Sequence, residues 1–228
     1  MMLDVRGMSK HFGGIYAVKD CTFSVKEGTI TSIIGPNGAG KTTLFNLING
    51  ILVPDAGAIV FQDQVITGLK PFEIARAGIS RTFQLAKVFK NLTVRDNLLL
   101  AKQATDTELQ ETLKKMHYAR DLDAKAGDLS YGQQRLVELA RATLLPHKLL
   151  LLDEPTAGVN PAVRKELATI LRDLKKQGNT ILLIEHDMDF VMGISDEIVV
   201  LNEGTVLAQG SPEAVQKNPR VLEAYLGK

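Results

Sequence analysis

Three short apolar segments stand out along the chain, and each is followed by a glycine or an acidic residue. They cover Thr29–Ile34, Leu149–Leu152 and Thr180–Ile184. Their short length and β-branched or leucine-rich composition are typical of strands buried on both faces, as in a parallel sheet. Helical patterns lie between these segments. Because strands alternate with helices, the pattern predicts an α/β layer fold.

Two of the intervening helices are predicted from the residues at their ends. The first runs over Pro161–Gln177, with Asn160 as its N-cap and Gly178 directly after it. Proline suits the first helical position, and glycine commonly follows a helix C-terminus. The second covers Ser211–Lys217 and begins Ser-Pro-Glu. Both helices fit the alternating arrangement.

The middle of the chain has a different character. From about Leu85 to Pro146 it lacks a convincing buried strand and carries helical patterns at Val94–Lys102 and Thr107–Met116. We therefore predict one domain with a helical subdomain, residues 85–146, inserted into a core. That core is formed by residues 1–84 and 147–228.

A hairpin is predicted close to the end of the chain. Glu197–Leu201 and Thr205–Gln209 flank the turn Asn-Glu-Gly. Gly204 takes the turn position that needs a positive φ.

Composition excludes several classes of protein. Lys and Arg number 27 and Asp and Glu 26, so the formal net charge of +1 provides no basic field for nucleic-acid binding. The single cysteine, Cys21, excludes an internal disulfide and indicates a reducing, cytoplasmic compartment. We expect no signal peptide and no membrane span, because apolar runs stop far below the roughly 18 residues a span needs. Any membrane role therefore runs through a partner.

The strongest motif lies directly after the first apolar segment. Gly35–Thr42 reads GPNGAGKT and matches G-x-x-x-x-G-K-S/T, ahead of a predicted helix over Thr42–Asn49. Glycines let successive backbone N–H groups face phosphate oxygens, and the helix N-terminus adds positive charge. Lys41 would reach the β- and γ-phosphates, and the Thr42 hydroxyl would bind Mg²⁺. The alternative is a glycine-rich turn with a surface lysine. The candidate nucleotide-binding residues are Asn37, Gly38, Ala39, Gly40, Lys41, Thr42 and Thr43.

Two acids follow the second apolar segment. Asp153 and Glu154 stand at its carboxyl end, where α/β sheets place ligands. Asp153 is the candidate to hold Mg²⁺, and Glu154 is the better candidate for the base that orients the attacking water. An ordinary acidic pair at a helix start, before Pro155, is the alternative.

A second possible anion site begins at Ser130. Ser130 and Gln133 have capping-box spacing, so a capped helix and nothing more is the simple interpretation. An exposed Ser/Gly helix start is also a phosphate site. Since the first loop already accounts for one triphosphate, this second site would serve the nucleotide of another subunit.

These motifs together resemble those of ATP-binding cassette (ABC) ATPases. Ser130-Tyr131-Gly132-Gln133 is similar to the family signature L-S-G-G-Q, with Tyr131 in place of the first glycine. The order also matches over essentially the whole chain. It runs from the phosphate loop through Gln84, the signature, Asp153-Glu154 and His186.

The resemblance implies a fold and further site residues. The fold is a P-loop NTPase (RecA-like) core with a parallel sheet, a small antiparallel β subdomain and an inserted α-helical subdomain. Phe12 matches the aromatic that stacks on adenine, with Val18 packing on the other edge and Tyr16 as the competing aromatic. Phe12 as a plain core residue is the alternative.

Two polar residues also match the family pattern. Gln84 matches the glutamine that reaches Mg²⁺ and the attacking water, although a surface amide would look the same. His186 matches the switch histidine that contacts the γ-phosphate, although lone histidines are more often structural. His186 follows the predicted strand Thr180–Ile184.

Details of the resemblance point to a transporter subfamily. The chain has Asn160 where many ABC ATPases have Asp, and this amide can still cap the helix that follows. The Tyr131 signature, the Gly-Val-Asn-Pro string and the ending Gln209–Glu213 look like importers of branched-chain or other hydrophobic amino acids. ATPases for urea or short amides, and for lipopolysaccharide export, share much of this pattern.

The resemblance further implies how such a chain works. Two copies, identical or paralogous, would pair head to tail around two MgATP, with Ser130, Gly132 and Gln133 of one copy facing the nucleotide of the other. Transmembrane permease subunits, and indirectly a periplasmic or extracellular substrate-binding protein, would be the partners. The expected place is the cytoplasmic face of the bacterial inner membrane. The competing classes are a soluble ABC ATPase of translation or DNA repair and a non-hydrolysing regulatory module.

Overall fold

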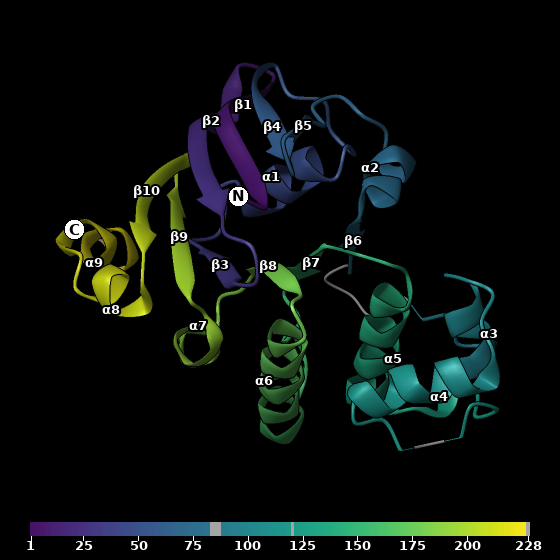
Figure 1. Cartoon of the computed structure of the whole chain (residues 1–228). Coiled ribbons are helices and arrows are strands. Elements are labelled where there is room, and N and C mark those ends of the chain that lie inside the picture. The colour runs from purple at the N-terminus through teal and green to yellow at the C-terminus, as the bar shows by residue number, and fades with distance from the viewer. Residues whose placement is uncertain (83–87, 120, 227–228) are drawn as a thin grey trace.

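A six-stranded sheet forms the centre of the molecule in the computed structural model, which describes residues 1–82, 88–119 and 121–226 (Figure 1). Its strand order is β10-β9-β3-β8-β7-β6, and all neighbours are parallel except β9 and β10. The apolar segments of the sequence are the middle strands. The bounds are β3 Ile30–Ile34, β6 Ile79–Arg81, β7 Leu149–Asp153, β8 Thr180–Ile184, β9 Glu197–Asn202 and β10 Thr205–Gly210.

The central strands are apolar at successive positions because both faces of the sheet are covered. In β7, Leu150 and Leu152 pack into one core, whereas Leu149 and Leu151 pack into another. A strand with one face in water would alternate apolar and polar residues instead. The α/β fold class with a parallel sheet is therefore confirmed.

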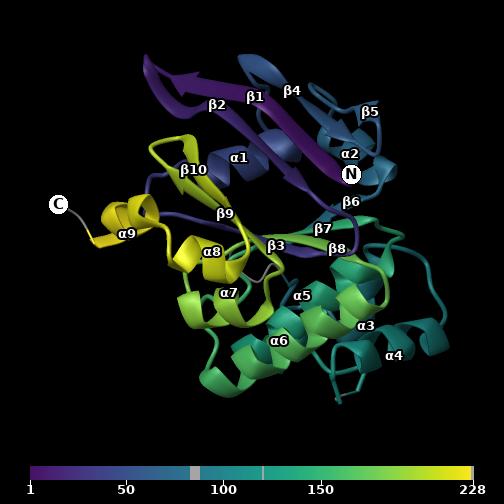
Figure 2. The same ribbon diagram turned by 60° about the vertical axis from the view of Figure 1, so that its left-hand side comes forward.

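An antiparallel sheet covers one side of the central sheet, with α1 (Lys41–Ile48) packed between the two (Figure 2). Its order is β2-β1-β4-β5, and it is the small β subdomain that the resemblance implies. The apolar pattern alone does not predict these strands, because only one face of each is consistently buried and β1 carries register shifts after Val5. The bounds are β1 Leu3–Phe12, β2 Ile15–Val25, β4 Ala56–Phe61 and β5 Gln64–Val65.

Helices cover the other side of the central sheet (Figure 1). α3, α4 and α5 lie together and come from the range predicted to be a helical subdomain, while α6 and α7 lie beside them. The exact boundaries of that subdomain, 85–146, stay a prediction. The bounds of these helices are α3 Val94–Leu99, α4 Asp106–Lys115, α5 Tyr131–Leu144, α6 Pro161–Lys176 and α7 Met188–Ile194, and those of the remaining helices are α2 Pro71–Ala77, α8 Pro212–Gln216 and α9 Pro219–Leu226.

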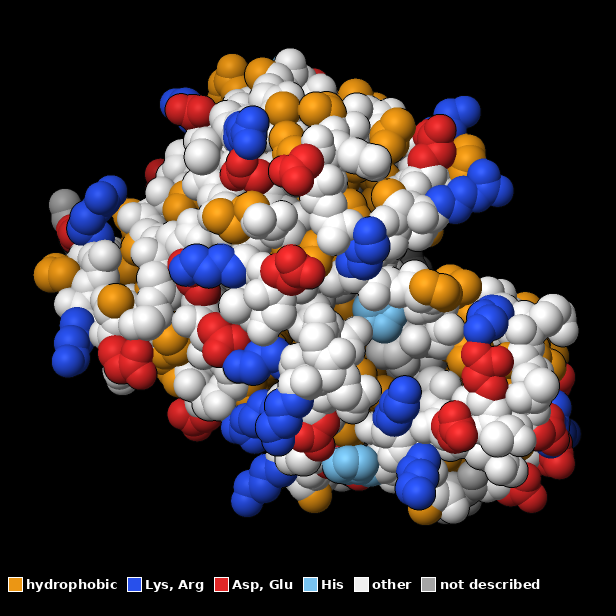
Figure 3. Space-filling model, viewed as in Figure 1, with side chains coloured by type: hydrophobic (Ala, Val, Ile, Leu, Met, Phe, Trp, Pro, Cys, Tyr) orange, Lys and Arg blue, Asp and Glu red, His pale blue; other side chains and the backbone are white. Residues whose placement is uncertain are grey.

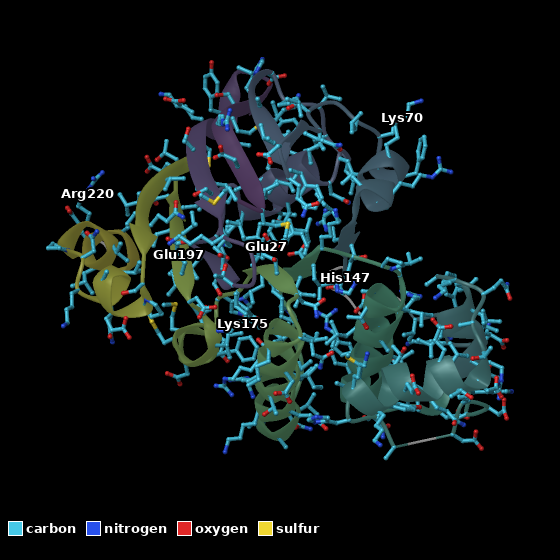
Figure 4. All side chains as sticks on the ribbon, viewed as in Figure 1. Glu27, Lys70, His147, Lys175, Glu197 and Arg220 are labelled. Carbon is cyan, nitrogen blue, oxygen red and sulfur yellow. The ribbon has the colours of Figure 1, made fainter. Side chains whose placement is uncertain are left out.

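The predicted ends of helix α6 and the predicted hairpin are confirmed. The Asn160 side chain accepts a hydrogen bond of 3.0 Å from the Val163 N–H, as an N-cap does. At the other end of α6, the Lys175 ammonium donates to Asp196 at 2.8 Å, just before β9 (Figure 4).

In the β9–β10 turn, Gly204 has φ of 76° and Glu203 has φ of 48°. Positive φ at both residues matches the twist of a tight hairpin.

Within the described part of the chain, every helix is too short or too polar to cross a bilayer.

Candidate nucleotide-binding site

The phosphate loop joins the carboxyl end of β3 to the N-terminus of α1. Gly40 is the N-cap of α1 with φ of 95°, and a Cβ there would lie 2.2 Å from the Ala17 carbonyl oxygen. A Cβ on Gly35 would lie 2.2 Å from the Leu201 carbonyl oxygen. The loop therefore needs glycine at both positions because backbone from β2 and β9 approaches it closely.

Lys41 lies inside this loop. Its Nζ donates to the carbonyl oxygens of Gly35 at 2.7 Å and Pro36 at 3.0 Å. Burial lowers the pKa of Lys41 below its usual range, and the negative charge of Glu154 opposes that shift. The ammonium is thus held beside a hollow of about 220 Å³. This hollow is lined by Ala17, Asn37, Gly38, Ala39, Gly40, Lys41, Thr42, Thr43 and Glu154.

The two predicted acids stand at the same edge of the sheet, with different surroundings. Asp153 ends β7, is buried, and accepts a hydrogen bond of 2.8 Å from the Arg81 guanidinium. Glu154 lines the hollow and has a left-handed backbone with φ of 48°. This conformation is strained for a residue with a side chain, and such strain concentrates at functional sites.

His186 lies next to Glu154. Its Nδ1 is 3.8 Å from Glu154 Oε2, and its side chain is 62% exposed. The strands β7 and β8 are parallel neighbours, so their carboxyl ends bring the two residues together. The structure therefore joins Lys41, Glu154 and His186 in one place. The prediction for Gln84 lies outside the described residues.

The oxygen donors near the loop fit a metal carried by a nucleotide. Thr42 presents an exposed hydroxyl, and Asp153 presents a carboxylate; both are hard oxygen ligands of the kind Mg²⁺ prefers. Among the described residues, no group of three or more His, Cys, Asp or Glu side chains forms a metal cage. Mg²⁺ commonly takes one or two protein oxygens and completes its shell with phosphate and water. The site matches that mode.

The signature segment forms a capped helix start away from the hollow. The Ser130 hydroxyl accepts from the Gln133 N–H at 3.3 Å, and the Gln133 side chain accepts from the Ser130 N–H at 3.0 Å. A Cβ on Gly132 would lie 2.7 Å from a Val163 methyl carbon of α6, so glycine is required there. The predicted capping box is confirmed. The described lining of the phosphate hollow contains none of the signature residues.

The aromatic residues predicted near the base lie on the β1–β2 hairpin. The exposed fractions are 50% for Phe12 and 53% for Tyr16, so the interpretation of Phe12 as a plain core residue is wrong. Val18 is only 1% exposed and packs in the core between the sheets. Its neighbour Ala17 lines the phosphate hollow, and the expectation that Val18 packs on an edge of the base stays a prediction.

Sequence reasoning missed Glu185, which joins the two site loops. Glu185 is fully buried, and its Oε1 accepts from the backbone N–H and the hydroxyl of Thr156 at 2.8 and 2.6 Å. Its Oε2 accepts from the backbone N–H groups of His186 at 2.9 Å and Asp187 at 3.3 Å. One carboxylate thus holds the loop after Glu154 and the loop of His186. Its only sequence signal is an acidic residue directly after an apolar strand.

We expect Glu185→Gln to lower the free energy of unfolding by about 2–4 kcal/mol, because hydrogen bonds to charged groups contribute about 1.5–3 kcal/mol each. In addition, the amide NH₂ would face N–H donors in one of the two loops. Thermal denaturation measures the loss, and kcat should fall with it. The exposed Glu111→Gln on α4 is the control. Equal stability of the two variants would contradict the role of Glu185.

Comparison with known proteins agrees with this fold and site. Residues 18–157 match the family model described as ABC transporter, and residues 205–228 match the model described as branched-chain amino acid ATP-binding cassette transporter. The high-affinity branched-chain amino acid transport ATP-binding protein LivG of Escherichia coli (strain K12) is 41% identical, with 100% of this chain and 98% of that protein covered.

Solved structures show the same architecture. An ABC transporter cassette in its ADP conformation superposes with a TM-score of 0.92 at 34% identity, covering 100% of this chain and 99% of that one. A dimeric bacterial ABC transporter cassette gives a TM-score of 0.82 at 26% identity, covering 92% and 99%.

The fold and the phosphate loop define a P-loop nucleoside triphosphatase. More narrowly, the chain belongs to the ABC transporter family of ATP-binding proteins. It is a nucleotide-binding, ATP-hydrolysing transporter subunit.

Proposed function

We propose that this protein hydrolyses ATP with Glu154 as the base and thereby powers uptake of branched-chain or other hydrophobic amino acids. The observation that carries the hydrolytic part is that Lys41 and Glu154 line one hollow, with His186 Nδ1 lying 3.8 Å from Glu154 Oε2. Glu154 accepts a proton from the attacking water, which a carboxylate can do when it is placed within hydrogen-bond reach.

The chain's other residues bind and orient the substrate. Lys41 turns from the carbonyl oxygens of its own loop toward the β- and γ-phosphates, and the N–H groups of residues 37–43 bind phosphate oxygens. His186 contacts the γ-phosphate from the neighbouring strand. Phe12, or Tyr16 beside it, stacks on the adenine. Phe has no polar group, so this contact discriminates little between bases.

The Thr42 hydroxyl and the Asp153 carboxylate would hold Mg²⁺, with Gln84 as a further ligand. When bound, Mg²⁺ supplies positive charge that neutralises the phosphate oxygens. Arg81 keeps Asp153 oriented through the buried hydrogen bond of 2.8 Å. Because Arg81 fixes the Asp153 Oδ2 atom, the carboxylate has the definite orientation that a metal ligand needs.

Two copies act as a head-to-tail dimer. Ser130, Gly132 and Gln133 of one copy bind the γ-phosphate held by Lys41 of the other, using the N–H groups of the first turn of α5. The second copy is identical or a paralogue. A related cassette is dimeric in its solved structure, which supports this arrangement. The dimer sits on the cytoplasmic face of the membrane, bound to permease subunits.

The substrate class is supported by the relatives rather than by the hollow. The named relatives are branched-chain amino acid transport ATP-binding proteins, and the C-terminal 205–228 match is to the same group. Selectivity in an importer lies in the permease and the external binding protein, so the cassette itself contacts no amino acid.

The test is reconstitution of the chain with the permease that co-purifies with it, in proteoliposomes containing ATP. We expect leucine, isoleucine or valine with the cognate external binding protein to stimulate phosphate release several-fold and to accumulate inside. Stimulation by urea, short amides or lipopolysaccharide alone would assign the chain to one of the related transporters instead. Hydrolysis that no membrane partner alters would assign it to the soluble class.

A further inference from the structure

A groove separates the β6 region from the helices α3 and α5, and its lining includes Arg81, which donates to Asp153. Figure 3 shows the surface hollowed between α2 and the helices α3 and α5. The groove has a volume of about 530 Å³ and a mainly apolar lining. Glu138 of α5 is part of that lining, although its side chain is almost fully buried.

Glu138 is joined to Arg135 one turn earlier on α5. Arg135 Nη1 donates to Glu138 Oε2 at 2.7 Å, and both side chains are at most 3% exposed. Charged side chains are rarely buried to this degree unless they are paired and hydrogen-bonded. The pair therefore has a definite geometry rather than the mobility of a surface ion pair.

The same guanidinium reaches the backbone of the proposed base. Arg135 Nη2 donates to the Glu154 carbonyl oxygen at 2.8 Å, and Nε donates to the Pro155 carbonyl oxygen at 3.3 Å. Glu154 has φ of 48°, a conformation that persists only where the surroundings hold it. Arg135 supplies such a hold, from a helix on a different part of the chain.

We propose that Arg135 is a positioning residue: it fixes the backbone of Glu154, and Glu138 connects that hold to the wall of the groove. The inference rests on the proposed role of Glu154 as the base. Since the guanidinium is planar, it bonds two carbonyl oxygens and one carboxylate at once, and lysine reproduces this only in part. A partner that presses on the groove wall therefore acts on the orientation of Glu154.

The experiment compares kcat and KM for ATP in the dimer bound to its permease. Arg135→Met alone removes the guanidinium that donates to the buried Glu138 carboxylate, and this variant risks unfolding. The double variant Arg135→Met with Glu138→Leu removes both charges and avoids that risk. We expect kcat to fall at least 10-fold in the double variant, with KM for ATP and nucleotide affinity within 2-fold of the native values.

Two further variants separate positioning from general damage. On a logarithmic scale, Arg135→Lys should lose at most half as much kcat as the double variant, because an ammonium still bonds one carbonyl oxygen. Arg172→Met is the matched control: it removes an arginine that donates to the Gly193 carbonyl oxygen at 2.9 Å on the far side of α6, and its kcat should equal the native value.

Each outcome decides the question. A native kcat in the double variant, with Glu154→Gln inactive in parallel, overturns the role of Arg135 and leaves the base assignment standing. A rise in KM for ATP at native kcat also overturns the role of Arg135. If Glu154→Gln itself hydrolyses ATP at the native rate, the proposed function fails first. For the groove wall, Glu138→Gln should reduce the fold-stimulation by the permease; unchanged stimulation removes Glu138 from the proposal.

Discussion

Replacing Glu154 by glutamine is expected to reduce ATP turnover by about 10²- to 10⁴-fold, the range that a general base contributes. The amide has nearly the shape of the carboxylate but accepts no proton from water. Nucleotide binding should persist, because Lys41 and the loop N–H groups are unchanged. The substitution also removes a negative charge close to Lys41, one that influences the pKa of that lysine. A triphosphate therefore meets less repulsion in the variant.

Phosphate release and the size of the particle measure the two parts of this result. We expect Glu154→Gln with saturating MgATP to form a stable dimer, seen by light scattering, and to release phosphate at background rate. Glu27→Gln, an exposed acid in the turn after β2, should behave as the native chain does (Figure 4). Robust hydrolysis by Glu154→Gln would refute the base assignment. Monomers only, alone and with the permease, would refute the nucleotide-bridged dimer.

Replacing Lys41 by alanine is expected to weaken ATP binding by about 10- to 100-fold, since a charge-assisted hydrogen bond contributes about 1.5–3 kcal/mol. The ammonium lies in the loop, 2.7 Å from the Gly35 carbonyl oxygen, and needs only a local turn to face a phosphate. Its pKa is lowered by burial, so an incoming triphosphate raises that pKa and the ammonium is stabilised on binding.

Titration calorimetry with ATP checks this prediction, and AMP provides an internal comparison. AMP lacks the β- and γ-phosphates, so its affinity should change little in Lys41→Ala. Lys114→Met, an exposed lysine in the last turn of α4, is the control for loss of a positive charge. Unchanged ATP affinity in Lys41→Ala would contradict the role of the loop. Equal losses for ATP and AMP would indicate damage to the loop rather than loss of a phosphate contact.

Local sequence patterns identified the strands buried on both faces and the capped helices. β7 and β8 are continuous apolar runs, and α6 has an N-cap, a first-turn proline and a following glycine. These signals are local, because each depends on a few consecutive residues. The antiparallel sheet gave no such signal: β1 and β2 bury one face unevenly, with register shifts in their pairing. It was expected from the family resemblance alone.

The order of the motifs along the chain also identified the main residues of the nucleotide site. A phosphate loop after one strand, an acid pair after a second and a histidine after a third must converge, because parallel strands share one carboxyl edge. The sequence therefore assigned Lys41, Glu154 and His186 to the same bound triphosphate. The sequence did not single out Ala17, which lines the phosphate hollow from β2.

Only the tertiary structure revealed the residues that hold this chemistry in place. Arg135 is 19 residues from Glu154, Arg81 is 72 from Asp153, and Glu185 is 29 from Thr156. No local pattern marks such partners, since burial and hydrogen bonding between distant segments arise when the layers pack. The sequence by itself determined which groups can react. The packing of α5 and the pairing of β6 and β8 with β7 decided which side chains fix their positions, because a buried charge can be satisfied only by groups that the fold brings to it.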